Sequence, residues 1–205
     1  MKEKIAWLWF HELKGFTLEQ KKQLLSIHHS PLSFYFSVAN IKKEHENSFA
    51  QAEILYNKSA ECGIDIFTIE DASDAGFDVN QSQWPLVIYY MGKPPLSKSV
   101  ALIGTRDLSA MGYYFIQEIL EWIKSEDKNI YAGFAAGVEK VAIEGAIKNG
   151  IQSTAVLTHG LDACYPKRCW HMMEKLKHQG TLVSPFPFGS KPNQFSFAIR
   201  NQLYL

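Results

Sequence analysis

The stretch Val100-Ala-Leu-Ile-Gly-Thr-Arg-Asp-Leu-Ser109 joins a short apolar run to a glycine and a serine that favours helix capping. The apolar run predicts a buried strand, because a strand covered on both faces shows continuous apolar residues rather than alternation. Gly104 permits a sharp turn, and Ser109 is a favoured N-cap for a helix expected near 109–125. Such a turn can bind an anion, to which Arg106 adds a forked cation. The alternative is an ordinary βα turn with a solvated arginine.

Strands and helices alternate after this stretch, which is typical of a parallel sheet with crossover helices. The expected elements are strands at 129–132, 153–157 and 181–184 and helices near 138–149 and 167–178. In such a sheet the strands end at one edge, where ligands bind. We therefore expect Arg106 and the loops 133–137, 158–168 and 185–192 to lie close together.

The first part of the chain is mainly helical. The expected elements are helices at 4–14, after the Thr17–Gln20 capping box, from Ser30-Pro31 and at 44–61, then strands at 64–70 and 86–91 separated by a turn-rich loop at 71–83. Gly63 is a plausible residue to follow the last of these helices. The predicted domains are a small helical domain over residues 1–62 and an α/β domain over residues 63–205.

Composition limits the class of protein. The chain is 46% hydrophobic and 20% charged, and it has no apolar run near the ~18 residues of a membrane span, so we expect a soluble protein without membrane association. The first residues lack the apolar core of a secretory signal, and three cysteines cannot all pair, so a cytoplasmic location is expected. Residues 151–205 carry six Lys and Arg against two Asp and Glu, a mildly basic balance that permits a polyanionic partner.

The sequence lacks the motifs that several classes of enzyme and metal site require. A nicotinamide enzyme needs Gly-x-Gly-x-x-Gly with an acid after the second strand, and a P-loop enzyme needs Gly-x-x-x-x-Gly-Lys-Ser/Thr; neither is present. Cys164, Cys169, His159 and His171 do not form the tight pairs of a zinc site, and no third group is visible to orient a Cys–His nucleophile. We therefore predict no catalytic residue, no metal and no cofactor.

Five motifs, in order, resemble those of the DNA processing protein A family (DprA, also called Smf). They are Ile103-Gly-Thr-Arg106, Gly133-Phe-Ala-Ala-Gly-Val-Glu139, Thr154–Leu157 with Gly160–Pro166, Leu182–Gly189 and Phe197-Ala-Ile-Arg-Asn201. The resemblance implies an α/β fold with a Rossmann-like, mainly parallel sheet flanked by helices, without the family's final strands. It also implies that residues 1–62 form the family's small helical domain, of SAM or helix-hairpin-helix type.

The same resemblance implies a function that is not enzymatic. Members bind single-stranded DNA, load a RecA-type recombinase onto it, serve DNA uptake in natural transformation and commonly form homodimers. Carried over to this chain, it implies nucleic-acid contacts by Gly104, Thr105, Arg106, Gly133, Gly137, Arg200 and Asn201, with Lys140, Tyr165 and Lys167 as further candidates. Four phenylalanines lie in the mildly basic region 151–205: Phe186, Phe188, Phe195 and Phe197. Phe186, Phe188 or Phe195 would stack on bases, or else the four rings cover one end of the sheet.

The chain departs from the family's motifs at three positions. Ala136 and Gln202 stand where the family has arginine, and Glu139 stands where it has aspartate. Because each lost phosphate contact flattens the salt dependence, weaker DNA binding than the family's is expected. Two alternatives stay open at this point: a nucleotide or small-ligand sensor on a related fold, and a family member that keeps the fold as a protein-interaction module.

Overall fold

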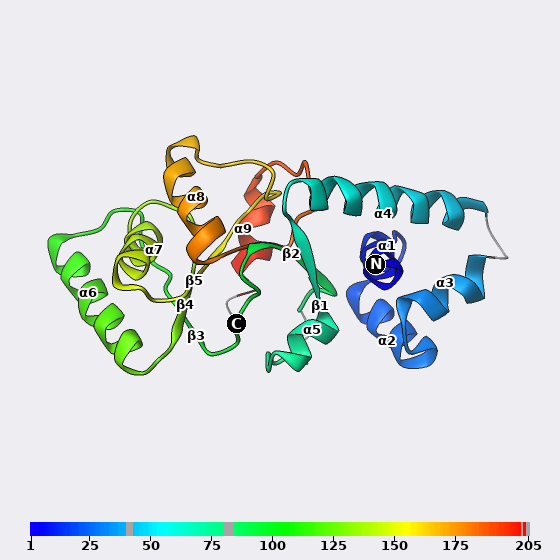
Figure 1. The fold of residues 1–205 in the computed structure, drawn as a ribbon, viewed down its shortest axis with the longest axis horizontal. Coiled ribbons are helices and arrows are strands. Elements are labelled where there is room, and N and C mark those ends of the chain that lie inside the picture. Colours follow the sequence, from blue (N-terminus) through cyan, green and yellow to red (C-terminus); the bar gives the residue numbers. More distant parts are fainter. Residues whose placement is uncertain (40–42, 80–83, 202, 204–205) are drawn as a thin grey trace. The chain divides into compact units, whose positions relative to one another are not determined.

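The computed structural model describes residues 1–39, 43–79, 84–201 and 203 (Figure 1). These residues form two compact units, Met1–Ile88 and Tyr89–Leu205. The boundary between these units falls inside the strand Val87–Gly92. The domain boundary that the sequence predicted, after residue 62, stays a prediction. Each unit is described by itself below.

Four helices build most of the first unit. They are α1 (Lys2–Glu12), α2 (Leu18–His28), α3 (Pro31–Ala39) and α4 (Lys43–Glu61). The predicted capping box at the start of α2 is confirmed, because the Thr17 hydroxyl accepts from Gln20 N at 3.2 Å and the Gln20 side chain accepts from Thr17 N at 2.8 Å. Trp9 is buried among aromatic rings from α3 and α4, and its Nε1 donates to Ser48 Oγ at 2.8 Å.

The first unit ends with a strand and a short helix, β1 (Asp65–Thr68) and α5 (Ile69–Asp74). The predicted strand over 64–70 is shorter because Thr68 caps α5: its hydroxyl accepts from Asp71 N, and the Asp71 carboxylate accepts from Thr68 N at 2.8 Å. The expected loop at 71–83 was therefore wrong at its start, and residues 80–83 lie outside the described residues.

The sheet is mixed, with its parallel part in the second unit. Its strands are β2 (Val87–Gly92), β3 (Ser99–Ala101), β4 (Asn129–Ala132), β5 (Ser153–Val156) and β6 (Thr181–Ser184), in the order β1-β2-β6-β5-β4-β3. Neighbours from β3 to β6 run parallel, with Val100 opposite Ile130 and Ala155 opposite Leu182. β2 runs antiparallel to β6, with Tyr89 opposite Ser184. The predicted mainly parallel sheet is confirmed.

Helices flank this sheet, as predicted. They are α6 (Ala110–Ser125), α7 (Val138–Asn149), the 3-10 turn η1 (Lys167–Cys169) leading into α8 (Trp170–Gln179), and α9 (Gln194–Asn201). Ser109 caps α6 as expected, since its Oγ accepts from Gly112 N at 3.1 Å. α6 and α7 contact β4, and α8 contacts β5 and β6. The sequence had not indicated α9, which starts where the Asn193 side chain accepts from Ser196 N at 3.0 Å.

Candidate functional site

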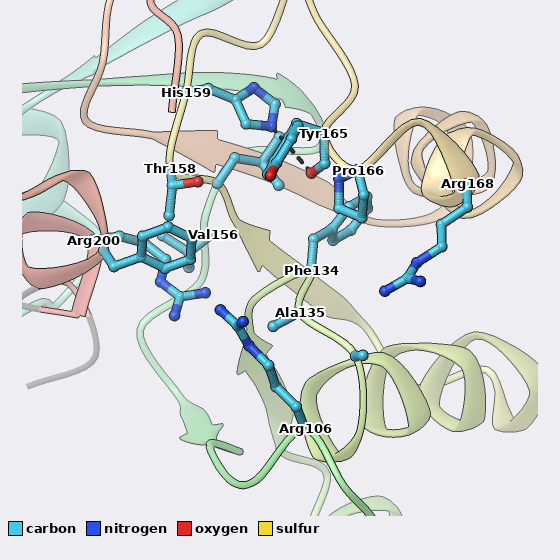
Figure 2. A pocket seen from close by; sticks show the side chains of 13 residues that line it. Arg106, Phe134, Ala135, Val156, Thr158, His159, Tyr165, Pro166, Arg168 and Arg200 are labelled. Atoms are coloured by element: carbon cyan, nitrogen blue, oxygen red, sulfur yellow. Dashed lines mark hydrogen bonds between the residues drawn. The ribbon is translucent and has the colours of Figure 1, made fainter. Parts of the chain in front are cut away.

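A cavity of about 170 Å³ lies in the second unit, where β4 and β5 end (Figure 2). Its lining comes from the loops after β3, β4 and β5 and from α9: Arg106, Phe134, Ala135, Ala136, Val156, Leu157, Thr158, His159, Tyr165, Pro166, Arg168, Phe197 and Arg200. Three of the four loops expected at this edge therefore meet. The fourth, 185–192, does not line the cavity but is hydrogen-bonded to the third: Gly160 N donates to Ser190 O at 3.0 Å, and Gly189 N donates to the Asp162 carboxylate at 2.8 Å.

Close packing against neighbouring atoms explains two of the glycines predicted at this site. Gly137 has φ +79°, and a Cβ there would overlap Thr105 O and lie 2.6 Å from Arg106 O. Val138 N donates to Thr105 O at 3.1 Å, which ties the first loop to the start of α7. A Cβ on Gly104 would lie 2.5 Å from Val138 Cγ2. Both glycines therefore position the loop that carries Arg106.

Arg200 forms a buried ion pair with Glu139. Its Nη1 and Nη2 donate to the two carboxylate oxygens at 3.2 and 3.1 Å, and the two side chains are only 6% and 4% exposed. Glu139 Oε2 also accepts from Ala135 N at 3.0 Å. Gly133 makes room for the pair, because a Cβ there would overlap Arg200 Nη1. Arg200 lines the cavity, and Glu139 balances its positive charge.

Phe197 lines the cavity, whereas the sequence had favoured Phe186, Phe188 or Phe195 for stacking on bases. Its ring lies 5.9 Å from the guanidinium carbons of both Arg106 and Arg200. Phe195 is 69% exposed. Phe186, Phe188 and Phe195 line neither this cavity nor the neighbouring groove described below. Phe197 and Arg200 are three positions apart in the chain, so they share one face of α9. Recognising Asn193 as a cap would have indicated that helix.

The cavity's second exposed arginine is Arg168, whereas the sequence had singled out its neighbour Lys167. In Figure 2, Arg106 and Arg168 lie on either side of Ala135. Neither arginine forms an ion pair with any part of the chain that the structure describes. Arg106 and Arg168 therefore supply the uncompensated positive charge of this cavity.

A wider groove of about 510 Å³ adjoins the cavity, and Lys140 and Gly137 line it. Lys140 Nζ lies 3.6 Å from Glu144 Oε1, and both side chains are about half exposed. Of the other predicted contacts, Tyr165 lines the cavity, while Lys167 and Asn201 line neither hollow. Asn201 Oδ1 instead accepts from Arg200 Nε at 3.1 Å. Gln202 lies outside the described residues.

The cysteine and histidine group at 159–171 plays a structural part. Burial raises the pKa of the Cys164 and Cys169 thiols, which is the opposite of what a nucleophilic thiolate needs. The buried His159 ring has Nδ1 2.8 Å from Gly160 O and Nε2 3.4 Å from Tyr165 O, so it links two points of its own loop. Within the described residues, no cluster of His, Cys, Asp and Glu could hold a metal ion, and no helix is long and apolar enough to cross a membrane.

Comparison with known proteins gives matches in sequence and in fold. The family model described as DNA recombination-mediator protein A matches residues 67–205. Protein Smf of Synechocystis is 30% identical over 125 residues, which are 58% of this chain and 31% of that protein. DNA processing protein DprA of Streptococcus pneumoniae is 29% identical over 121 residues, 58% of this chain and 43% of that protein. The matched part therefore spans less than half of either relative.

Two solved structures share the fold. The X-ray structure of S. pneumoniae DNA processing protein A superposes with a TM-score of 0.73 at 21% identity, covering 100% of this chain and 75% of that chain. DNA processing protein A from Helicobacter pylori, studied for its single-stranded DNA binding mode, superposes with a TM-score of 0.51 at 24% identity, covering 58% of this chain and 55% of that chain.

Proposed function

The chain belongs to the DNA recombination-mediator protein A family, and from this we propose that it binds single-stranded DNA at the cavity lined by Arg106 and Phe197. The H. pylori relative is described by its single-stranded DNA binding mode, which supports the choice of ligand. The observation that carries the proposal is the exposed Arg106 guanidinium beside the Phe197 ring, 5.9 Å away. An arginine suits phosphate, and an aromatic face suits a base.

The charge balance of the cavity supports the same ligand. Arg106 and Arg168 are exposed and have no acidic partner among the described residues, whereas Glu139 neutralises Arg200. An anion that binds in the cavity can therefore interact with two cations that no acidic side chain among the described residues neutralises. Tyr165, which is 54% exposed, adds a second aromatic face to the lining. Single-stranded nucleic acid combines both needs, because its phosphates are charged and its bases are unstacked.

The wider role is proposed on the family resemblance alone. We propose that the protein acts in DNA processing without catalysis, as a homodimer in the cytoplasm. Loading of a RecA-type recombinase and support of DNA uptake in natural transformation are the activities proposed for it.

The test is a fluorescence-anisotropy titration of labelled oligo-dT against the protein and its Arg106→Ala variant at two salt concentrations. We expect the variant to bind at least about tenfold more weakly, because a charge-assisted hydrogen bond contributes about 1.5–3 kcal/mol. Its salt slope should be shallower by about 0.7. The matched control is Lys124→Ala, an exposed cation at the far end of α6, which should bind like the parent.

Equal affinity of the parent and a folded Arg106→Ala variant would refute the assignment of Arg106. Free mononucleotides should compete poorly with the oligonucleotide. Strong competition would instead favour a nucleotide sensor, and the absence of any binding would favour an interaction module.

A further inference from the structure

The cavity continues into the second, wider groove. Arg106, Ala136 and Arg168 line both hollows, so the two adjoin along these three residues. Ala136 carries only a methyl group at this border. A ligand longer than the cavity therefore has a direct way into the groove.

The groove has the chemistry of a nucleic-acid channel. Arg106, Arg168 and Lys140 contribute cations from three different elements, and Tyr113 of α6 contributes an aromatic ring that is 53% exposed. The acid near Lys140 is Glu144, in a half-exposed pair at 3.6 Å that is worth little in water and can be exchanged for a phosphate contact. Proteins that bind single-stranded nucleic acid combine cations along the backbone path with aromatic rings on which the bases stack.

We propose that the groove is a second subsite for single-stranded DNA, entered from the cavity past Ala136. Arg168 contacts the phosphate at the junction, Lys140 contacts the next phosphate, and Tyr113 stacks on a base in the groove. This inference rests on the proposed function of the cavity. It also changes one expectation from the sequence, because Arg168 supplies at the junction a cation that Ala136 does not.

The test is the dependence of affinity on oligonucleotide length. Oligo-dT of about four and about twelve nucleotides, which bracket the site sizes of single-strand binding folds, are titrated with the full chain. We expect the longer oligonucleotide to bind at least tenfold more tightly. Tyr113→Leu should reduce this ratio at least about fivefold, since stacking on one aromatic ring contributes about 1–3 kcal/mol.

Two further variants separate the groove from the rest of α7. Lys140→Gln should also reduce the ratio, whereas Lys148→Gln, an exposed lysine near the other end of the same helix, should not. A parent protein that binds both lengths equally, or a Tyr113→Leu variant with an unchanged ratio, overturns the groove and leaves the cavity standing. Failure of the parent to bind either length overturns both proposals.

Discussion

Replacing Glu139 by Gln should destabilise the protein strongly, although the two side chains have the same shape. The carboxylate accepts three hydrogen bonds, from Arg200 at 3.1 and 3.2 Å and from Ala135 N at 3.0 Å, and it is 4% exposed. A glutamine has one acceptor oxygen, and its NH₂ would face another donor. The Arg200 charge would also lose the Glu139 carboxylate, and breaking a buried ion pair in this way costs about 3–5 kcal/mol.

Urea unfolding followed by circular dichroism measures this cost. With a urea m-value of about 2 kcal/mol per molar, the midpoint should fall by about 2 M. Glu144→Gln is the control, because it removes the carboxylate of a half-exposed pair on the same helix and should cost below about 1 kcal/mol. The double variant Glu139→Gln with Arg200→Met should recover part of the loss, since no unpaired charge remains.

The same Glu139→Gln substitution should weaken the fold but strengthen the electrostatic part of DNA binding. Loss of the Glu139 charge removes the buried carboxylate that pairs with Arg200 at the cavity wall, so the variant should bind oligo-dT with a steeper salt dependence than the parent, provided that it is folded. The reasoning is refuted if Glu139→Gln and Glu144→Gln lower the unfolding midpoint equally.

Three further predictions concern a cap, a turn and a buried histidine. Ser109→Ala should cost about 1 kcal/mol in thermal unfolding, because it removes the acceptor for Gly112 N; an unfolding temperature equal to the parent's would contradict this. Gly137→Ala should both destabilise the protein and weaken oligo-dT binding, because a Cβ at φ +79° would overlap Thr105 O and displace the loop of Arg106; native affinity with native stability would contradict this. Burial, with the nearby Lys21 charge, lowers the pKa of His11 from 6.5 to about 4, so the unfolded state alone binds a proton between these values. Stability should therefore fall by up to about 3 kcal/mol as the pH drops through this window, and urea unfolding of the parent and His11→Gln at about pH 7.5 and pH 5 should show that loss mainly in the parent.

Local signals in the sequence predicted the loop and helix after β3 correctly, but the predicted burial of the strand was wrong. β3 ends at Ala101, its residues are half-buried or exposed, and it lies at the end of the strand order, so it is not covered on both faces. Ser109 and Gly104 have their effects within a few residues, so pattern and capping preference were enough to place α6 and the loop before it. Thr68 and Asn193 cap helices too, but one ends an apolar strand and the other follows a proline-rich loop. The helices α5 and α9 were therefore not predicted, and without α9 the position of Phe197 could not be predicted either.

Long-range partners could not be derived in this way. Glu139 and Arg200 are separated by 61 residues, and no local pattern indicates that one neutralises the other. Gly133 looked like a ligand-contact glycine, whereas the structure shows it making room for that ion pair. Arg168 and Lys167 are adjacent in the chain, and only the turn of η1 decides which of them lines the cavity.

The attachment of α9 has a consequence for amide hydrogen exchange. The fully buried residues of this helix are Ser196 and Arg200, so no fully buried apolar side chain of α9 contributes to its docking, whereas the Glu139–Arg200 ion pair does. Opening of α9 exposes little hydrophobic surface, and elements with few buried apolar contacts exchange through such local openings. Its amides should therefore exchange earlier than those of α7, which buries Ala142, Ile143 and Ala146. A ligand resting on Phe197 should slow that exchange, making α9 a reporter of occupancy in the cavity.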